Sequence, residues 1–315
     1  MKIVYMGTPE FAVEPLRLLV ERGYAVEAVV TMPDKPSGRG LKLNESAVKR
    51  YARSAGIPVL QPEKLKDEGF LQQLRGINAD LFIVVAFRML PEVVWTMPRL
   101  GTFNLHASLL PQYRGAAPVS WAIINGETET GVTTFFLQHE IDTGSIIFQE
   151  KVPIKPDDNV GSLYDKLMKA GAELVIKTVD AIDKGKVDPT PQVSSQEERP
   201  KEAPKIFKET CRIDWSKKGA DIVNLIRGLS PYPSAFSHFI GNATEVQVKI
   251  FAASFEEKVH NAGLGTYFSD EKTYLKVACI DGFVFLKELQ LAGKKRLNIQ
   301  DFLRGFKAES FQRLE

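Results

Sequence analysis

The sequence predicts an α/β protein with a Rossmann-like, mostly parallel sheet and helices on both faces, followed by a small OB-like β-barrel. Over residues 1–189, short apolar runs typical of buried strands alternate with helical segments, which is the pattern of parallel sheets. Over residues 208–315, short strands are separated by turn signals, as in small barrels. Residues 190–207 are rich in proline and polar side chains and lack apolar periodicity, so we expect a linker there.

The first elements are an apolar strand over residues 3–6, a turn, and a helix that ends near Gly23. Thr8 is expected to cap this helix, with Pro9 at its first position. The turn contains one glycine, Gly7, where a dinucleotide-binding fold requires three. This difference argues against a dehydrogenase, although it leaves the fold class unchanged.

The same alternation predicts further strands and a long helix in the first domain, and mainly strands in the second. In the first domain, strands are expected at residues 25–31, 57–60, 80–86, 102–106, 132–137 and 146–148, and a helix at 163–185. In the second domain, a helix is expected from Lys218 to Gly228, with Ser216 as its cap. Strands are expected there at residues 235–240, 246–253, 273–278 and 283–289.

The charge balance excludes a protein that binds nucleic acid with its whole surface. The chain carries 41 Lys+Arg and 39 Asp+Glu, a formal charge of +2. Residues 206–315 contain 16 basic and 13 acidic side chains, so the small surplus lies in the second domain. Any contact with nucleic acid is therefore expected to be local.

Cysteine usage and apolar patterning limit the other function classes. The two cysteines form no CxxC pair or Cys/His cluster, so neither a disulfide framework nor a metal site is expected. No window approaches the roughly 20 apolar residues of a membrane span, and the first residues lack a signal-peptide cleavage pattern. We expect a cytoplasmic protein without membrane association, and a monomer because no coiled-coil pattern is present.

Two polar side chains on one predicted strand are the strongest indication of chemistry. Asn104 and His106, at positions i and i+2, point to the same face near the carboxyl end of the strand, where open α/β sheets bind ligands. An amide can donate to a developing oxyanion and a histidine can move protons, which suits acyl-type transfer. Ser108 lies outside any GxSxG turn, so a covalent acyl-enzyme is disfavoured.

Asp142, in the polar turn at residues 138–145, could reach the same crevice and either orient His106 or relay a proton through water. Structural interpretations of all three residues stay open on this reasoning. His106 would then be a buried histidine with one satisfied hydrogen bond, Asn104 a strand-end cap, and Asp142 an Asx turn before Gly144.

A second polar segment, residues 33–42, is rich in glycine and proline and carries three basic residues against one acidic residue. Such a composition is typical of a solvated loop, and it would also suit contact with phosphates. The basic residues are Lys35, Arg39 and Lys42.

Four segments resemble the folate-dependent formyltransferase family, and the resemblance runs over essentially the whole chain. They are residues 5–12, 104–118, 141–144 and 212–215. The resemblance implies transfer of the formyl group of 10-formyltetrahydrofolate, without a metal, to the α-amino group of methionine on initiator methionyl-tRNA. The product would be N-formylmethionyl-tRNA for translation initiation.

The resemblance also assigns roles to individual residues. It implies that Asn104, His106 and Asp142 are catalytic, and that Arg39 lies in an insertion loop that recognises the acceptor stem together with Lys35 and Lys42. The folate-binding residues that it implies are Ser108, Leu109, Leu110, Pro111, Arg88 and Leu90. Arg88 and Leu90 are expected to act through their main chain. Phe87-Arg88 stand where the family often has a glycine, and Ser145 where many relatives have Asp.

Two rival functions remain besides the dehydrogenase. A formyltransferase acting on an amino sugar nucleotide would share the three catalytic residues, whereas the basic loop and the match through Trp215 favour tRNA. A nucleic-acid-binding module centred on the barrel would account for the basic second domain but would leave Asn104, His106 and Asp142 without a role.

Overall fold

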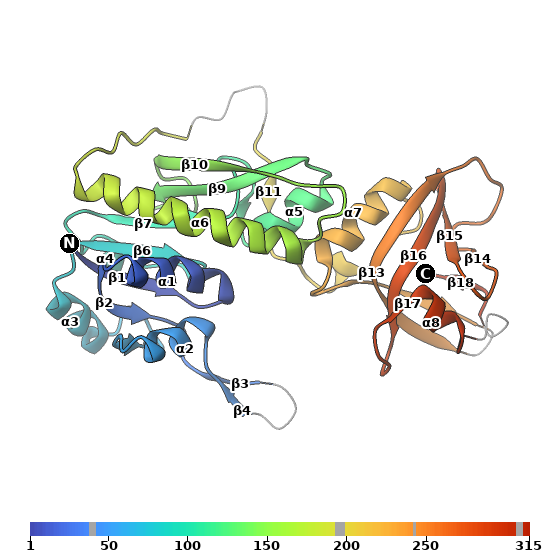
Figure 1. Ribbon diagram of the computed structural model, residues 1–315, viewed down its shortest axis with the longest axis horizontal. Helices are drawn as coiled ribbons and strands as arrows, with labels where there is room; N and C mark the ends of the chain where they lie inside the picture. Colours follow the sequence, from blue (N-terminus) through green and yellow to red (C-terminus); the bar gives the residue numbers. More distant parts are fainter. Residues whose placement is uncertain (38–41, 193–198, 242–243, 307–310) are drawn as a thin grey trace. The chain divides into compact units, whose positions relative to one another are not determined.

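The computed structural model describes the chain except for residues 38–41, 193–198, 242–243 and 307–310 (Figure 1). The described part divides into two compact units. The first unit comprises residues 1–115, 129–153 and 164–202, and the second comprises residues 116–128, 154–163 and 203–315. None of the described helices is long and apolar enough to cross a membrane.

The first unit is built on one sheet in which most neighbouring strands run parallel, as the sequence predicts. Its strands are β1 (Lys2–Gly7), β2 (Ala25–Val30), β5 (Val59–Leu60), β6 (Leu81–Val85), β7 (Thr102–His106), β9 (Glu129–Phe136) and β10 (Ile146–Pro153). They are arranged in the order β10-β9-β7-β6-β1-β2-β5. The neighbouring pairs β7–β6, β6–β1, β1–β2 and β2–β5 are parallel, whereas β9 is antiparallel to both β7 and β10.

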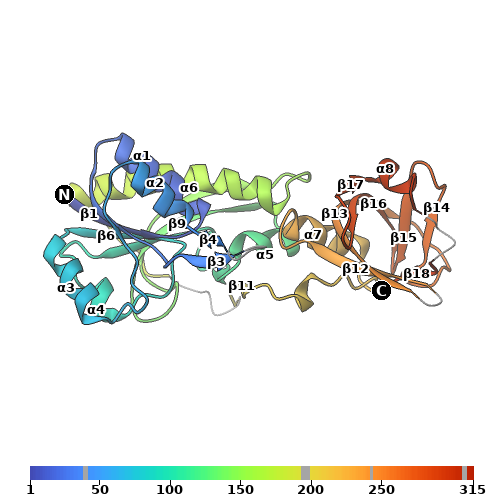
Figure 2. The ribbon, with the colours of Figure 1, turned by 90° about the horizontal axis from the view of Figure 1, so that it is seen from below.

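Helices cover both faces of this sheet (Figure 2). They are α1 (Val13–Glu21), α2 (Ala47–Ser54), α3 (Glu68–Ile77), α4 (Glu92–Trp95) and α6 (Val160–Asp183). Alternate residues of β1 and β6, such as Val4 and Phe82, pack with Phe70, Leu74 and Val94 of α3 and α4 in one buried cluster. Burial on both faces explains why β6 is apolar along its whole length.

The first helical turn differs from the sequence prediction. A 3-10 turn, Glu10–Ala12, precedes α1. The N-cap of this turn is Pro9, not Thr8. Pro9 has an extended backbone, with φ −78° and ψ 178°, so the chain becomes helical only after it. The Thr8 hydroxyl is buried and has no hydrogen-bond partner in the described residues.

The second unit contains an antiparallel sheet that nearly closes into a barrel. Its strands are β12 (Ala235–Ile240), β13 (Glu245–Glu257), β14 (Tyr267–Ser269), β15 (Leu275–Cys279), β16 (Gly282–Leu291), β17 (Leu297–Asn298) and β18 (Arg313–Leu314). The order is β14-β15-β16-β13-β12-β18, and β17 pairs with β16. The Leu314 amide donates to the Gly265 carbonyl at 2.9 Å, which brings the two ends of the sheet together. The predicted OB-like barrel is thus present.

Three helices complete the second unit: α5 (Pro118–Ile124), α7 (Gly219–Leu229) and α8 (Ile299–Leu303). The predicted Ser216 cap of α7 is wrong, because the N-cap is Lys218 and the Ser216 hydroxyl donates to Asp214. The amide of Gly219 donates instead to Asp281 Oδ1 at 2.8 Å, from 62 residues further along the chain. Side chains from α7, α8 and the strands form one core around Trp215, Phe239 and Leu286.

Candidate active site

The polar pair predicted at the end of β7 lies next to the antiparallel strand β9. Asn104 is opposite Phe135, and His106 is opposite Thr133. Asn104 is partly buried and His106 is buried, at 7% exposure. Because side chains alternate between the two faces of a sheet along a strand, both residues lie on one face, as predicted.

The His106 ring is fixed by a backbone group. Its Nε2 lies 2.9 Å from the carbonyl oxygen of Tyr113. Because a carbonyl only accepts, Nε2 carries the hydrogen, and Nδ1 is the nitrogen left for other contacts. Tyr113 has a φ of 61°, and its amide donates to the carbonyl of Lys201 at 2.6 Å.

Asp142 lies in the loop between β9 and β10, beside this ring. Its Oδ2 is 3.9 Å from His106 Nδ1, beyond hydrogen-bond distance, and accepts the Gly115 amide at 3.1 Å. In this structure the hydrogen bond to the His106 ring comes from the Tyr113 carbonyl, so an orienting role of Asp142 stays a prediction. Asp142 remains close enough to stabilise a positive charge on His106.

The backbone of the Asp142 loop is tightly constrained. Asp142 has a φ of 55°, a left-handed conformation that Asp tolerates better than most residues. Two residues later, a Cβ on Gly144 would lie 1.6 Å from the carbonyl oxygen of Phe136. No side chain fits at that position, so glycine is required for the loop to pack against the end of β9.

The Asn104 carboxamide makes no hydrogen bond to any of the residues that the structure describes. It is not fully buried, so water or a substrate can reach it. Its NH₂ is therefore a hydrogen-bond donor that has no acceptor among the described residues, on the same face of β7 as His106.

The predicted folate loop, residues 108–111, is held by Thr133 of β9. The Thr133 hydroxyl donates to the Ser108 carbonyl at 2.6 Å and accepts the Leu110 amide at 3.2 Å. Ser108 Oγ donates to the Gln112 carbonyl at 2.6 Å, so this side chain is already used within the protein. Leu110 is buried, whereas Leu109 and Pro111 are partly exposed.

The two residues predicted on the turn between β6 and α4 use their side chains in contacts within the protein. Arg88 donates from Nη1 to the Glu63 carbonyl at 2.8 Å and from Nη2 to the Pro62 carbonyl, and burial lowers the pKa of its guanidinium. Leu90 packs into the core beside α3 and α4. The role expected for the main chain of these two residues stays a prediction.

The predicted tRNA-binding residues are placed only in part. Lys35 and Lys42 lie on β3 (Lys35–Ser37) and β4 (Lys42–Asn44), which pair in an antiparallel ribbon. Arg39 lies outside the described residues. Residues 35–37 and 42 of the segment expected as a loop are thus in paired strands.

Three residues of the site were missed by the sequence analysis: Tyr113, Thr133 and Gln192. Tyr113 and Thr133 act through a carbonyl and a hydroxyl on neighbouring elements, and Gln192 lies in the predicted linker. No periodicity or spacing marks such contacts in the sequence. Within the described residues, no group of three His, Cys, Asp or Glu side chains could hold a metal ion.

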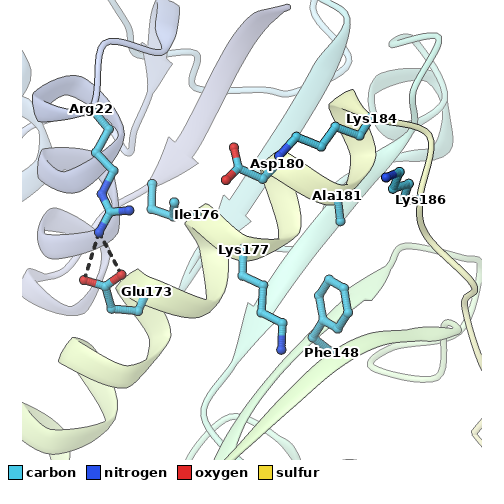
Figure 3. A pocket seen from close by; sticks show the side chains of 9 residues that line it. All are labelled: Arg22, Phe148, Glu173, Ile176, Lys177, Asp180, Ala181, Lys184 and Lys186. Atoms are coloured by element: carbon cyan, nitrogen blue, oxygen red, sulfur yellow. Dashed lines mark hydrogen bonds and ion pairs between the residues drawn. The ribbon is translucent and has the colours of Figure 1, made fainter.

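A surface depression of about 520 Å³ also lies on the first unit, but it contains none of the predicted site residues (Figure 3). Most of its lining comes from α6. Arg22 pairs with Glu173 across one end, and Lys177 Nζ lies 4.6 Å from the centre of the Phe148 ring. The exposed lysines Lys184 and Lys186 complete the other end.

Comparisons with known proteins match both parts of the chain. A family model described as formyl transferase matches residues 1–179, and one described as formyl transferase, C-terminal domain, matches residues 205–307. A Parabacteroides distasonis protein named methionyl-tRNA formyltransferase is 60% identical, covering 98% of this chain and 96% of that protein. A Bacteroides fragilis protein of the same name is 61% identical, covering 97% and 95%.

Solved structures show the same fold at lower sequence identity. The chain is similar to WlaRD, a sugar 3N-formyl transferase solved in the presence of dTDP and 5-N-formyl-THF. The TM-score is 0.66 and the identity is 21%, covering 94% of this chain and 99% of that chain.

Proposed function

The chain belongs to the formyl transferase family, and we propose that it formylates the α-amino group of methionine on initiator methionyl-tRNA with 10-formyltetrahydrofolate as donor. The product is N-formylmethionyl-tRNA for translation initiation. One observation carries this function: two proteins named methionyl-tRNA formyltransferase are 60% and 61% identical over nearly the full chain. The similarity to the sugar-acting structure, at 21% identity, is evidence for the fold alone.

In the proposed reaction, the methionyl amine attacks the formyl carbon, and a C–N bond forms while the formyl oxygen gains negative charge. Asn104 donates to this oxygen, because its NH₂ has no acceptor among the described residues. His106 Nδ1, the nitrogen that Tyr113 leaves open, takes part in moving the amine proton, and Asp142 stabilises the charged ring. The C–N10 bond then breaks, N10 takes up a proton, and tetrahydrofolate leaves.

The formyl donor is proposed to bind the main chain of residues 108–111, together with the main chain at Arg88 and Leu90. The side chains of Ser108, Arg88 and Leu90 are already occupied by protein contacts. Backbone groups of loops held on rigid strands suit the recognition of a flat, polar ring system.

The tRNA is proposed to contact Arg39, Lys35 and Lys42, with residues 208–315 as a second contact region. Residues 206–315 carry a surplus of three basic side chains, which is enough for a few phosphate contacts. Residues 1–189 would hold the folate and the aminoacyl end, and residues 190–207 would link the two regions. We propose that the protein acts as a monomer in the cytoplasm, where tRNAs are charged.

One assay tests this function. Purified protein is incubated with 10-formyltetrahydrofolate and methionyl-tRNA, beside an amino sugar nucleotide as alternative acceptor and an NAD(H) absorbance control. Formylmethionyl-tRNA should form at a rate that depends on the protein. Formyl transfer to the sugar nucleotide alone would overturn the proposed acceptor, and no transfer to either acceptor would overturn the proposed function.

A further inference from the structure

Gln192 connects the loop that carries Asp142 to Arg114, in the segment that follows the strand of Asn104 and His106. It lies in the segment after α6, 50 residues from Asp142 in sequence. Its Nε2 donates to the carbonyl oxygens of Asp142 at 2.9 Å and Gly144 at 2.8 Å. Its Oε1 accepts from Nε of Arg114 at 3.1 Å and from Nη2 of Arg114 at 2.7 Å. The carboxamide thus uses both of its N–H groups and both acceptor positions of its oxygen.

These four bonds join parts of the chain that come from different strands. Asp142 and Gly144 follow β9, whereas Arg114 and Gly115 follow β7 and the His106 site. One further bond, from the Gly115 amide to Asp142 Oδ2, joins the same loops at 3.1 Å. The Gln192 side chain therefore sets the spacing between the Asp142 loop and the segment that follows Tyr113.

Asp142 needs such support because of its backbone conformation. Its φ of 55° is in the left-handed region, which L-residues adopt at an energetic cost unless neighbouring contacts hold it. A small backbone rotation there would move Oδ2 relative to His106 Nδ1, now 3.9 Å away. Gln192 holds the carbonyl of Asp142 itself and that of Gly144, on either side of Thr143.

We propose that Gln192 is a positioning residue for Asp142. This inference rests on the proposed function, because it assigns Gln192 a role in the reaction that Asp142 is proposed to support. Gln192 is partly exposed and lies outside the hydrophobic cores. Its loss is therefore expected to alter the reaction rate more than the stability of the fold.

The first experiment compares Gln192→Ala with the wild type in formyl transfer to methionyl-tRNA. We expect kcat to fall about 10-fold or more, the usual scale for residues that orient catalytic groups. The KM for methionyl-tRNA and the Kd for tetrahydrofolate should stay within about twofold, because Gln192 contacts neither proposed substrate site. A loss confined to KM or to tetrahydrofolate affinity would overturn the inference.

Two further variants separate positioning from a change in folding. Gln192→Glu keeps the acceptor for Arg114 but places a carboxylate against the Asp142 and Gly144 carbonyls, so we expect kcat to fall as for Gln192→Ala. If Gln192→Ala does not fold, Gln192→Glu is the variant that tests the inference. The matched control is Gln72→Ala, the same substitution at an exposed position of α3 that is assigned to neither substrate. The control should keep wild-type kcat.

A double-mutant cycle shows whether Gln192 acts through Asp142. In an Asp142→Ala background, Gln192→Ala should lower kcat by less than twofold further, because the group that it positions is gone. A full additional 10-fold loss would overturn the inference while leaving the proposed function intact. A wild-type rate for Asp142→Ala alone would overturn the proposed role of Asp142, and the inference with it.

Discussion

Tyr113 holds His106 through its backbone: the Tyr113 carbonyl oxygen lies 2.9 Å from His106 Nε2. The side chain of Tyr113 plays no part in this bond, so the ring of a residue in β7 is oriented by the path of the loop that follows the strand. The free Nδ1 then faces Asp142 Oδ2 at 3.9 Å. This arrangement leaves one ring nitrogen for chemistry and fixes where it points.

Replacing any one of the three proposed catalytic side chains with Ala should lower kcat about 100-fold or more. This is the usual size of the effect for an oxyanion donor or an acid–base group. The variants are Asn104→Ala, His106→Ala and Asp142→Ala, measured by formyl transfer to methionyl-tRNA. His139→Ala is a matched control, because His139 is 73% exposed and faces Glu92. Rates near wild type in folded variants would contradict the assignment.

Thr133→Val should weaken the use of the formyl donor. The substitution keeps the shape but removes a hydroxyl that bonds the Ser108 carbonyl and the Leu110 amide, and it leaves these buried groups unpaired at a cost of about 1–3 kcal/mol. The expected result is a several-fold higher KM for 10-formyltetrahydrofolate. Thr134→Val, at the next position of β9, is the control, since Thr134 bonds Thr178 instead. An equal rise in KM for both variants would rule out a specific role of residues 108–111.

Gly144→Ala should displace the Asp142 loop. The added Cβ would lie 1.6 Å from the Phe136 carbonyl oxygen, which is backbone and cannot rotate away. We expect a loss of about 1–3 kcal/mol in the free energy of unfolding together with a lower kcat. Gly76→Ala is the control, because a Cβ on this glycine of α3 meets no atom within 4 Å. The free energy of unfolding of Gly76→Ala should be about 0.5–1 kcal/mol higher than that of the wild type, because alanine favours a helix more than glycine does. Denaturant unfolding gives both values.

Arg39→Ala should weaken methionyl-tRNA use without changing tetrahydrofolate binding. Removing one phosphate contact lowers the slope of log KM against log salt concentration by about one. Arg75→Ala is the control, because Arg75 pairs with Glu68 on the exposed face of α3. Unchanged kinetics and salt dependence for Arg39→Ala would exclude the loop from tRNA recognition.

Asp80 is expected to make stability depend on pH in the acid range. The Lys2 amide, and then Arg99, hold the pKa of Asp80 below its ordinary value. A lowered folded-state pKa stabilises the protein above the unfolded pKa of about 4, and this contribution is lost as pH falls through the folded-state value. Asp80→Asn should therefore be less stable than the wild type at pH 7, and the difference should shrink below about pH 4. A difference that is constant from pH 7 to pH 3 would contradict this linkage.

Much of the fold could be predicted because apolar periodicity is local. The strands at residues 102–106 and 235–240 have the predicted bounds, and Asn104 and His106 share a face because side chains alternate along any strand. The caps of α1 and α7 could not be predicted in the same way. The Gly219 amide at the start of α7 is bonded by Asp281, 62 residues away, and no local pattern contains that partner.

The sequence by itself determined the α/β sheet, the following barrel, and the residue types that suit acyl-type transfer. Only the tertiary structure decided that the Tyr113 carbonyl orients His106 and that Asp142 Oδ2 lies 3.9 Å from His106 Nδ1. It also decided that Gln192 joins the Asp142 loop to the segment after Tyr113. The physical reason is that strand periodicity depends on neighbouring residues, whereas these contacts depend on how loops from β7, β9 and the segment after α6 meet in space.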